Sequence, residues 1–320
     1  MRIDDILDLE PITVAQHRRT QEIHAVLDPS CARPHSGSPS ESALTYTLAH
    51  HFLEGARAAA QHRNPTELAW YRTTHHHDLT HLALPAPNGS TLVIAPNRGE
   101  LLRSSLSDTA YYLINQSTRF ADGRLRRLVA DAITFAGQAG FSRLIGRHGS
   151  VICLLRQREP RQTLHSWSIS RLPGTIYTEH CNDPWILARD LIHEAGHHWL
   201  NNALTATNTN IPDTVSYFSP WRDAQRPAYA FIHACWAFSL TILYTTRILS
   251  TVNIHTTRDL LNRYLTEQHL LLHDAATNIE PALDLLAPSL RIRVARTLTA
   301  ASNLAAFHPE SSAPPRTAAP

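Results

Sequence analysis

Three residues near the middle of the chain, His193, Glu194 and His197, form the pattern HExxH. If this stretch is helical, the two histidines share one face and lie about 6 Å apart along the helix axis. Both imidazoles can then bind one ion, and neutral imidazole suits zinc, iron, nickel and copper. The spacing therefore predicts a first-row transition metal without identifying it.

The helix that must carry this motif has a strong start signal. Asp183 can cap the first turn, and Pro184 fits the first helical position. Apolar residues then keep a helical period from Ile186 to Leu200. Gly196 lies inside the helix, where it leaves room beside the metal-binding face at a cost of about 1 kcal/mol relative to alanine. Because a buried helix seldom carries unpaired polar groups, these flanks favour a functional motif over a chance one.

HExxH is usually interpreted as the motif of a zinc-dependent metallopeptidase or amidase, with Glu194 as the general base. Two histidines leave such a site incomplete, so a third ligand must come from elsewhere. The metzincin pattern would require glycine at Leu200 and histidine at Ala203, and the chain has neither. A gluzincin-type site would use a later glutamate, and the next one is the distant Glu267. The peptidase is therefore weakened but stays the alternative.

His233 is the candidate third ligand. It lies in the apolar segment RPAYAFIHACWAF, which enters a helix at Pro227. A lone histidine on an apolar helix is more often a hydrogen-bonded core residue, but downstream of an HExxH helix a buried imidazole has a partner in the metal. Arg222 and Arg226 precede this helix, four residues apart. They are either ordinary surface cations or a guanidinium site for a carboxylate ligand.

The order of these segments resembles a known family. DLIHEAGHHWLNNAL, followed by SPWRDAQRPAYAFIHACWAFS and preceded by SRLPGTIYT, is similar to the HExxH motif-containing peptide-modification proteins. Members of that family are described as 2-oxoglutarate-dependent HExxH-type peptide β-hydroxylases. The resemblance is best over residues 165–245, and HExxH followed by PWRxxxRP is more specific than HExxH alone.

The resemblance implies an iron(II) oxygenase that uses 2-oxoglutarate as cosubstrate. His193 and His197 would bind the iron, with His233 as the third ligand. Arg222 or Arg226 would hold the distal carboxylate of 2-oxoglutarate. The role of Glu194 stays open, as a ligand, as a residue that orients a neighbouring histidine, or as the base of the alternative zinc enzyme.

The resemblance also implies a substrate. That substrate is a side-chain Cβ in a ribosomally synthesised precursor peptide, hydroxylated during natural-product maturation. A leader segment would hold the peptide, or a separate partner protein would deliver it.

Composition excludes several other functions. The chain has 320 residues, 43% of them hydrophobic and 18% charged, which is typical of a globular protein. A net charge of +2 gives no field that would recruit nucleic acid or anionic lipid. All 29 basic residues are arginine, so a lysine base, a Schiff base and a P-loop are excluded.

Cysteine spacing and hydropathy indicate a cytoplasmic protein. The cysteines are far apart and lack CxxC spacing, which is typical of reduced thiols; they are Cys31, Cys153, Cys181 and Cys235. The N-terminus lacks the apolar core of a signal peptide. Residues 226–247 are apolar enough for a marginal membrane span, but their polar residues favour a buried core helix.

Periodicity predicts an α+β fold that is mainly helical, with a helical bundle around a small β-sheet that leads into the HExxH helix. Helices are expected at 44–60, 107–139, 227–250, 257–275 and 288–305, and short strands at 91–95, 151–155, 166–170 and 175–178.

We expect one domain over 1–308. It would have a helical N-terminal part at 1–145, a metal-binding core at 146–250 and a helical C-terminal part at 251–308. The tail at 309–320 is expected to be disordered. The cluster His75–His77 has no spacing that suits a closed metal site and is expected to be a solvated loop.

Overall fold

A five-stranded mixed sheet lies at the centre of the computed structural model, which describes residues 3–28, 39–74, 79, 81–86, 89–104, 107–159, 162 and 164–305. Its order is β1-β2-β5-β7-β6, with β2, β5 and β7 parallel and the two edge strands antiparallel to them. The strands are β1 Leu84–Ala86, β2 Gly89–Ile94, β5 Val151–Gln157, β6 Ser166–Ser168 and β7 Thr175–His180. The fold is α+β and mainly helical, as predicted.

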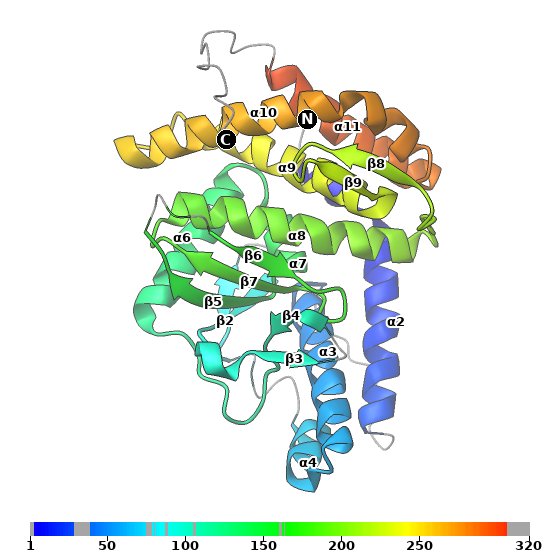
Figure 1. Ribbon diagram of the computed structural model, residues 1–320. Coiled ribbons are helices and arrows are strands. Elements are labelled where there is room, and N and C mark those ends of the chain that lie inside the picture. Colours follow the sequence, from blue (N-terminus) through cyan, green and yellow to red (C-terminus); the bar gives the residue numbers. More distant parts are fainter. Residues whose placement is uncertain are drawn as a thin grey trace, which may run out of the picture.

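Helices cover both faces of this sheet and build a further layer beyond it (Figure 1). On the N-terminal side these are α1 Ile3–Leu7, α2 Glu10–Leu27, α3 Pro39–Gln61, α4 Pro65–Thr73, α6 Gly123–Gln138 and α7 Ser142–His148. On the C-terminal side they are α8 Pro184–Ala206, α9 Ala228–Ile248, α10 His255–Leu283 and α11 Pro288–Ala305. Two hairpins lie outside the sheet, β3 Leu102–Ser104 with β4 Ser107–Tyr111, and β8 Ser216–Ser219 with β9 Ala224–Pro227.

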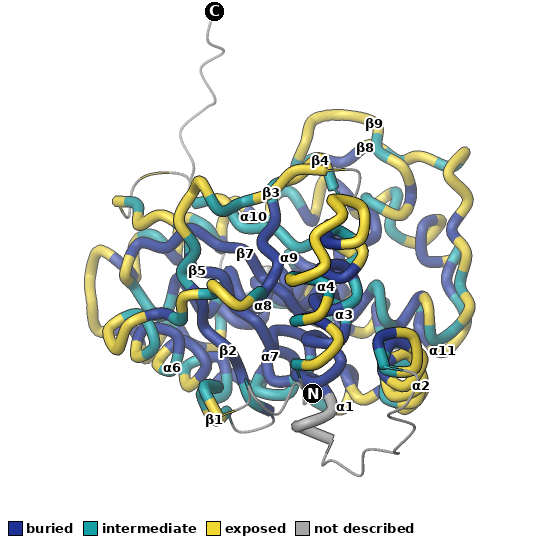
Figure 2. The backbone as a smooth tube through the Cα atoms, turned by 90° about the horizontal axis from the view of Figure 1, so that it is seen from below, coloured by how far each residue is buried: buried dark blue, intermediate teal, exposed yellow. Residues whose placement is uncertain are grey.

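Alternation along the strands explains why both faces are covered. On β2, Val93 packs into the core formed with α6, α7 and α8, whereas Leu92 and Ile94 pack with Leu44 and Leu48 of α3. The parallel strands β5 and β7 alternate in the same way, so their side chains are buried on both sides. Figure 2 shows β5, β7 and α8 as mostly buried stretches, with exposed residues gathered at the periphery.

The main core cluster joins residues from Ile3 in α1 to Ala301 in α11. The N-terminal and C-terminal helices therefore share one core, which is compatible with the expected single domain. In the described part of the chain, one helix, α9, is long and apolar enough to cross a membrane, but 83% of its apolar window is buried inside the protein. Its apolar character matches the core helix that was predicted at 227–250.

The predicted helix at 107–139 is wrong in its first half. Residues Ser107–Tyr111 instead form β4, which pairs with β3. The helix begins only at Gly123, because the side chain of Asp122 accepts a hydrogen bond from the backbone N–H of Leu125 and so caps it. The N-terminal part at 1–145 is also less helical than expected, since it supplies β1 to β4, including the buried strand β2.

The remaining expected strands and helices are confirmed, with boundaries shifted by a few residues. The largest extension is α10, which continues to Leu283 through Pro281. The expected tail at 309–320 and the histidine cluster His75–His77 lie outside the described residues.

Burial of His51 predicts acid sensitivity of the fold. Its Nδ1 accepts the Ile114 N–H at 3.3 Å, and its Nε2 therefore donates to the Thr175 hydroxyl at 2.9 Å. Burial, reinforced by nearby His50, lowers the pKa of His51 to about 3. Below pH 6.5 the unfolded chain thus binds a proton at this site that the folded protein excludes, and the free energy of unfolding falls as the pH falls towards 3.

The contribution of this one group reaches about 1.4 kcal/mol per pH unit over that range. We expect His51→Gln to be less stable at pH 7, because it loses the two hydrogen bonds, yet to have a shallower pH dependence than wild type. Urea unfolding at pH 5, 6 and 7 measures both. Identical slopes for the two proteins would contradict the prediction.

Candidate functional site

The HExxH helix is fixed at its start and along its length. The Asp183 carboxylate accepts the backbone N–H groups of Trp185 and Ile186 at 2.9 and 3.1 Å, as expected for the predicted cap. Gly196 has a different role from the one expected, because it faces α9. A Cβ there would lie 2.8 Å from a Leu240 methyl group, so glycine lets α9 approach α8 closely.

His193 and His197 lie side by side on α8, as their spacing predicts. Their Nε2 atoms are 3.1 Å apart, and the ring centroids are 4.7 Å apart at nearly right angles. Both side chains are half-buried, so the edge that carries these nitrogens is partly accessible. Two imidazole nitrogens at this separation can bind one ion from adjacent positions.

His233 reaches the same cluster from α9, but through the other side of the His197 ring. Its Nδ1 lies 3.0 Å from Nδ1 of His197, and the two rings are stacked with centroids 5.2 Å apart. The Nε2 of His233 is buried and has no hydrogen-bond partner among the described residues. The three predicted imidazoles are therefore adjacent.

The three rings do not point at a common centre in this arrangement. His197 presents Nε2 to His193 and Nδ1 to His233, and these two nitrogens lie on different edges of its ring. Within the described part of the chain, no group of three or more His, Cys, Asp or Glu side chains is placed to hold one ion. A role for His233 as third ligand requires one ring to rotate. As placed, His233 instead fixes the orientation of His197.

Burial keeps the three imidazoles neutral. It lowers the pKa of His193 to about 4, with a smaller contribution from Arg189. It also lowers the pKa of His197 well below its usual value, assisted by the neighbouring histidines, and that of His233 to about 3. Neutral imidazole is the form that binds metal ions.

Glu194 turns away from the histidines towards the edge strand β6. Its Oε1 accepts the Ser166 hydroxyl at 2.8 Å, and the side chain is 3% exposed. Burial raises the pKa of this carboxyl to about 7, although hydrogen bonds from Ser166 and Ser168 act in the opposite direction. Such a group can exchange a proton near neutral pH.

Arg226 lies close to the histidines and forms no ion pair with a described carboxylate. It is on β9, opposite Tyr217 in the β8–β9 hairpin, and is half-buried. The strand β9 contacts α9, the helix that carries His233. Burial is the main cause of the lowered pKa of His197 and of His233, and the charge of Arg226 adds to it. Arg222 is at the exposed hairpin turn. Burial is the main cause of the lowered pKa of Arg226, and the charge of Arg222 lowers that pKa further.

Another arginine near the cluster, Arg189, already forms an ion pair with a neighbouring carboxylate. It contacts the Asp190 carboxylate at 2.6 Å and lies over the Tyr264 ring at 4.5 Å. Among the described residues, Arg226 is therefore a cation near the histidines that is left to bind an incoming anion.

Apolar rings cover another side of the cluster. His193 packs against Phe238 with ring centroids 4.8 Å apart, and Phe238 stacks on Trp221 at 5.0 Å. The Trp221 indole donates to Gln268 of α10. Glu267, the ligand expected for a gluzincin-type site, is exposed on the same helix and has no contact with the histidines among the described interactions.

Two groups of site residues were not anticipated from the sequence. Ser166 and Ser168 lie two apart on β6 and act on Glu194 from one face of the strand. Tyr229 lies four residues before His233 on α9 and packs on its ring at 4.3 Å. The i, i+4 spacing was a signal that could have revealed this tyrosine.

His198 faces away from the cluster, as expected from the 100° step between neighbouring helix positions. Its Nε2 donates to the Thr175 carbonyl of β7 at 2.9 Å.

No protein-family model and no curated protein sequence matches this chain. We therefore infer the function of the protein from the chemistry of this site.

Proposed function

We propose that the protein is an iron(II)- and 2-oxoglutarate-dependent oxygenase that hydroxylates a side-chain Cβ in a ribosomally synthesised precursor peptide. One oxygen atom of O2 enters the substrate C–H bond, and the other enters succinate, which forms from 2-oxoglutarate with loss of CO2. The main support for this proposal is that Arg226, which forms no ion pair with a described carboxylate, lies near three neutral, adjacent imidazoles.

The donor set fits iron(II). His193 and His197 would bind it through Nε2, and His233 would either complete the set after a ring rotation or hold His197 in place through Nδ1. Bound iron(II) would supply the activation of O2. This use of histidines differs from the 2-His-1-carboxylate arrangement of other non-haem iron oxygenases, because Glu194 points at β6.

Side chains around the histidines would select 2-oxoglutarate and exclude water. Arg226 would pair with the distal carboxylate of 2-oxoglutarate and orient it towards the histidines. The stacked rings of Phe238 and Trp221 would exclude water on their side of the site. Arg222 would add positive potential from the hairpin turn without direct contact.

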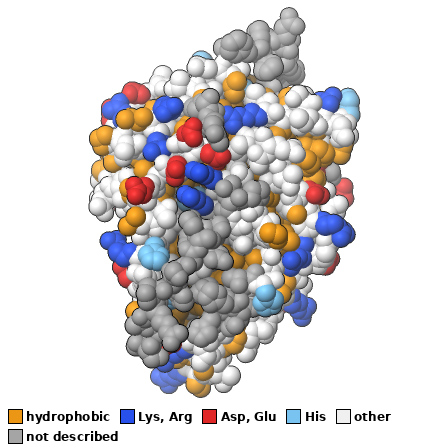
Figure 3. Space-filling view, turned by 180° about the vertical axis from the view of Figure 1, so that it is seen from behind, with side chains coloured by type: hydrophobic (Ala, Val, Ile, Leu, Met, Phe, Trp, Pro, Cys, Tyr) orange, Lys and Arg blue, Asp and Glu red, His pale blue; other side chains and the backbone are white. Residues whose placement is uncertain are grey.

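A cytoplasmic location and the absence of nucleic-acid binding belong to the same proposal. Cys153, Cys181 and Cys235 are free and buried, which suits a reducing compartment. Figure 3 shows basic and acidic side chains interspersed on one face, which suits a peptide substrate better than a polyanion. A delivery partner for the peptide remains part of the proposal.

A zinc-dependent metallopeptidase or amidase is the second candidate. The observation in its favour is Glu194, a buried carboxyl with a pKa of about 7 next to the histidine pair, which suits a general base. Against it stand the direction of Glu194 towards Ser166 and the exposed position of Glu267 on α10.

Replacing Glu194 with glutamine separates the two candidates. The amide keeps an acceptor for the Ser166 hydroxyl, so the fold is expected to persist. We expect Glu194→Gln to retain iron binding and to change succinate formation by less than about 10-fold, whereas loss of a general base lowers a rate by about 10²–10⁴-fold. Succinate release from 2-oxoglutarate and zinc-dependent peptide cleavage are both measured for each protein. Wild-type cleavage that falls by about 10²–10⁴-fold in Glu194→Gln would favour the base role.

The direct test of the activity uses anaerobic protein reconstituted with iron(II) and 2-oxoglutarate. Admission of oxygen should produce succinate, and a peptide substrate should gain one oxygen atom. Peptide cleavage that needs zinc and proceeds without oxygen would establish the peptidase instead.

A further inference from the structure

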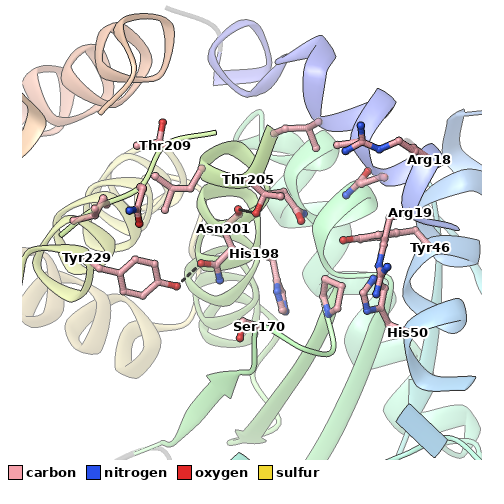
Figure 4. A pocket seen from close by; sticks show the side chains of 18 of the residues that line it. Arg18, Arg19, Tyr46, His50, Ser170, His198, Asn201, Thr205, Thr209 and Tyr229 are labelled. Carbon is pink, nitrogen blue, oxygen red and sulfur yellow. Dashed lines mark hydrogen bonds between the residues drawn. The ribbon is translucent and has the colours of Figure 1, made fainter. Parts of the chain in front are cut away.

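A cavity of about 560 Å³ lies beside the histidine cluster, on the far side of Tyr229. Residues of α2, α3 and α8, the turn after β6 and the segment after α8 line it. Figure 4 shows Tyr229 and Asn201 towards one side, and Arg18, Arg19, Tyr46 and His50 towards the other. Its size suits several residues of a peptide better than a single small ion.

Three polar atoms of lining residues have no hydrogen-bond partner in the described part of the chain. They are Nδ1 of His198, Nε2 of His50 and Nε2 of Gln16. His198 is 1% exposed, and because its Nε2 donates to the Thr175 carbonyl, its Nδ1 is an acceptor. The Gln16 amide nitrogen is a donor.

A peptide backbone offers the complementary groups. Its N–H can satisfy an acceptor such as His198 Nδ1, and its C=O can satisfy the Gln16 donor. A free carboxylate supplies acceptors only and would leave His198 Nδ1 without a donor. The unsatisfied donor and acceptor in the wall of the cavity therefore favour an amide-containing ligand.

Charge is polarised along the cavity. At the α2 end, Arg18 and Arg19 share a single carboxylate, that of Glu22, at 3.7 and 3.0 Å. The other acid in the lining, Asp213, is on the segment after α8. The α2 end thus keeps an excess positive charge that an acidic side chain would match.

The cavity is connected to the histidine cluster by one side chain. The Tyr229 ring packs on His233 with centroids 4.3 Å apart, and its hydroxyl donates to Asn201, which also lines the cavity. A chain that extends from the cluster past Tyr229 would therefore enter the cavity.

We propose that this cavity binds the segment of the peptide substrate that flanks the modified residue, with an Asp or Glu side chain of that segment at Arg18 and Arg19. The proposal rests on the proposed function in that the substrate is a peptide. It adds a second recognition site, remote from the reacting atoms, that selects acidic sequences.

The test is a binding selection on the full-length protein with a displayed library of random dodecapeptides, without iron, 2-oxoglutarate or oxygen. Selected peptides should be enriched in Asp and Glu. One selected peptide, labelled with fluorescein, should bind at least 10-fold more weakly to an Arg18→Glu/Arg19→Glu variant and to Thr205→Trp, which places an indole in the cavity from the exposed face of α8.

Matched controls are Arg263→Glu and Thr266→Trp, two exposed positions on α10 away from this cavity, which should leave the dissociation constant unchanged. Selected peptides without an excess of acidic residues, or binding that Thr205→Trp leaves intact, would overturn the proposal. Because binding is measured without turnover, failure of this proposal would leave succinate formation as a separate test of the oxygenase.

Discussion

Replacing His197 with alanine is expected to abolish the binding of one equivalent of iron(II) and to eliminate succinate formation. His197 is the central ring of the cluster, because its Nε2 faces His193 and its Nδ1 faces His233. Loss of an outer partner of a metal ligand lowers affinity by about 10–100-fold, so loss of this ligand should exceed that range. Metal analysis after anaerobic reconstitution and desalting measures the effect.

The matched control is His255→Ala. His255 is on the exposed surface of α10, where it pairs with Asp259, and its replacement should leave one equivalent of iron bound. Circular dichroism of both variants verifies that each is folded. A folded His197→Ala variant that still binds one equivalent of iron would show that the metal is held elsewhere.

Replacing Arg226 with leucine is expected to raise the KM for 2-oxoglutarate by about 10–100-fold, because a hydrogen bond to a charged group contributes roughly 1.5–3 kcal/mol. The kcat at saturating 2-oxoglutarate should stay within about 3-fold of wild type. A residue that only binds the distal carboxylate stabilises the bound substrate and the transition state equally. Succinate formation at varied 2-oxoglutarate concentration gives both constants.

Two further variants make this prediction specific. Arg226→Lys should recover only part of the affinity, because lysine lacks the paired donors of a guanidinium. Arg222→Leu should have a smaller effect, since Arg222 is exposed at the hairpin turn. A larger KM change for Arg222→Leu than for Arg226→Leu would reassign the carboxylate site to the turn.

Local signals in the sequence were sufficient for the helix that carries the motif. Asp183 and Pro184 fix its first turn, and the four-residue spacing of His193 and His197 fixes their shared face. Strands β5 and β7 were also predictable, because short β-branched and apolar runs between turn signals are typical of buried parallel strands. These features depend on residues that are close in sequence.

Two short hairpins were missed, although their paired strands are close in sequence. Ser107–Tyr111 forms a strand because it pairs with β3. The helix that was expected to begin at residue 107 therefore begins only after its cap at Asp122. The β8–β9 hairpin, which places Arg226, has short and largely exposed strands without a distinct apolar pattern. Tertiary pairing decides such segments more than propensity does.

The orientation of the site side chains was equally beyond the sequence. The position of His233 downstream of the HExxH helix predicted that it lies near the pair, but which ring nitrogen faces His197 depends on how α9 packs over Gly196. The direction of Glu194 depends on Ser166 and Ser168 of the edge strand, which precede it by more than 20 residues.

The most direct test is a crystal structure of the anaerobic protein with iron(II) and N-oxalylglycine, with anomalous data collected at the iron edge. We expect one anomalous peak within about 2.2 Å of Nε2 of both His193 and His197, with the distal carboxylate of the inhibitor paired to Arg226. An iron peak away from this pair, or an inhibitor whose distal carboxylate avoids Arg226, would contradict this expectation.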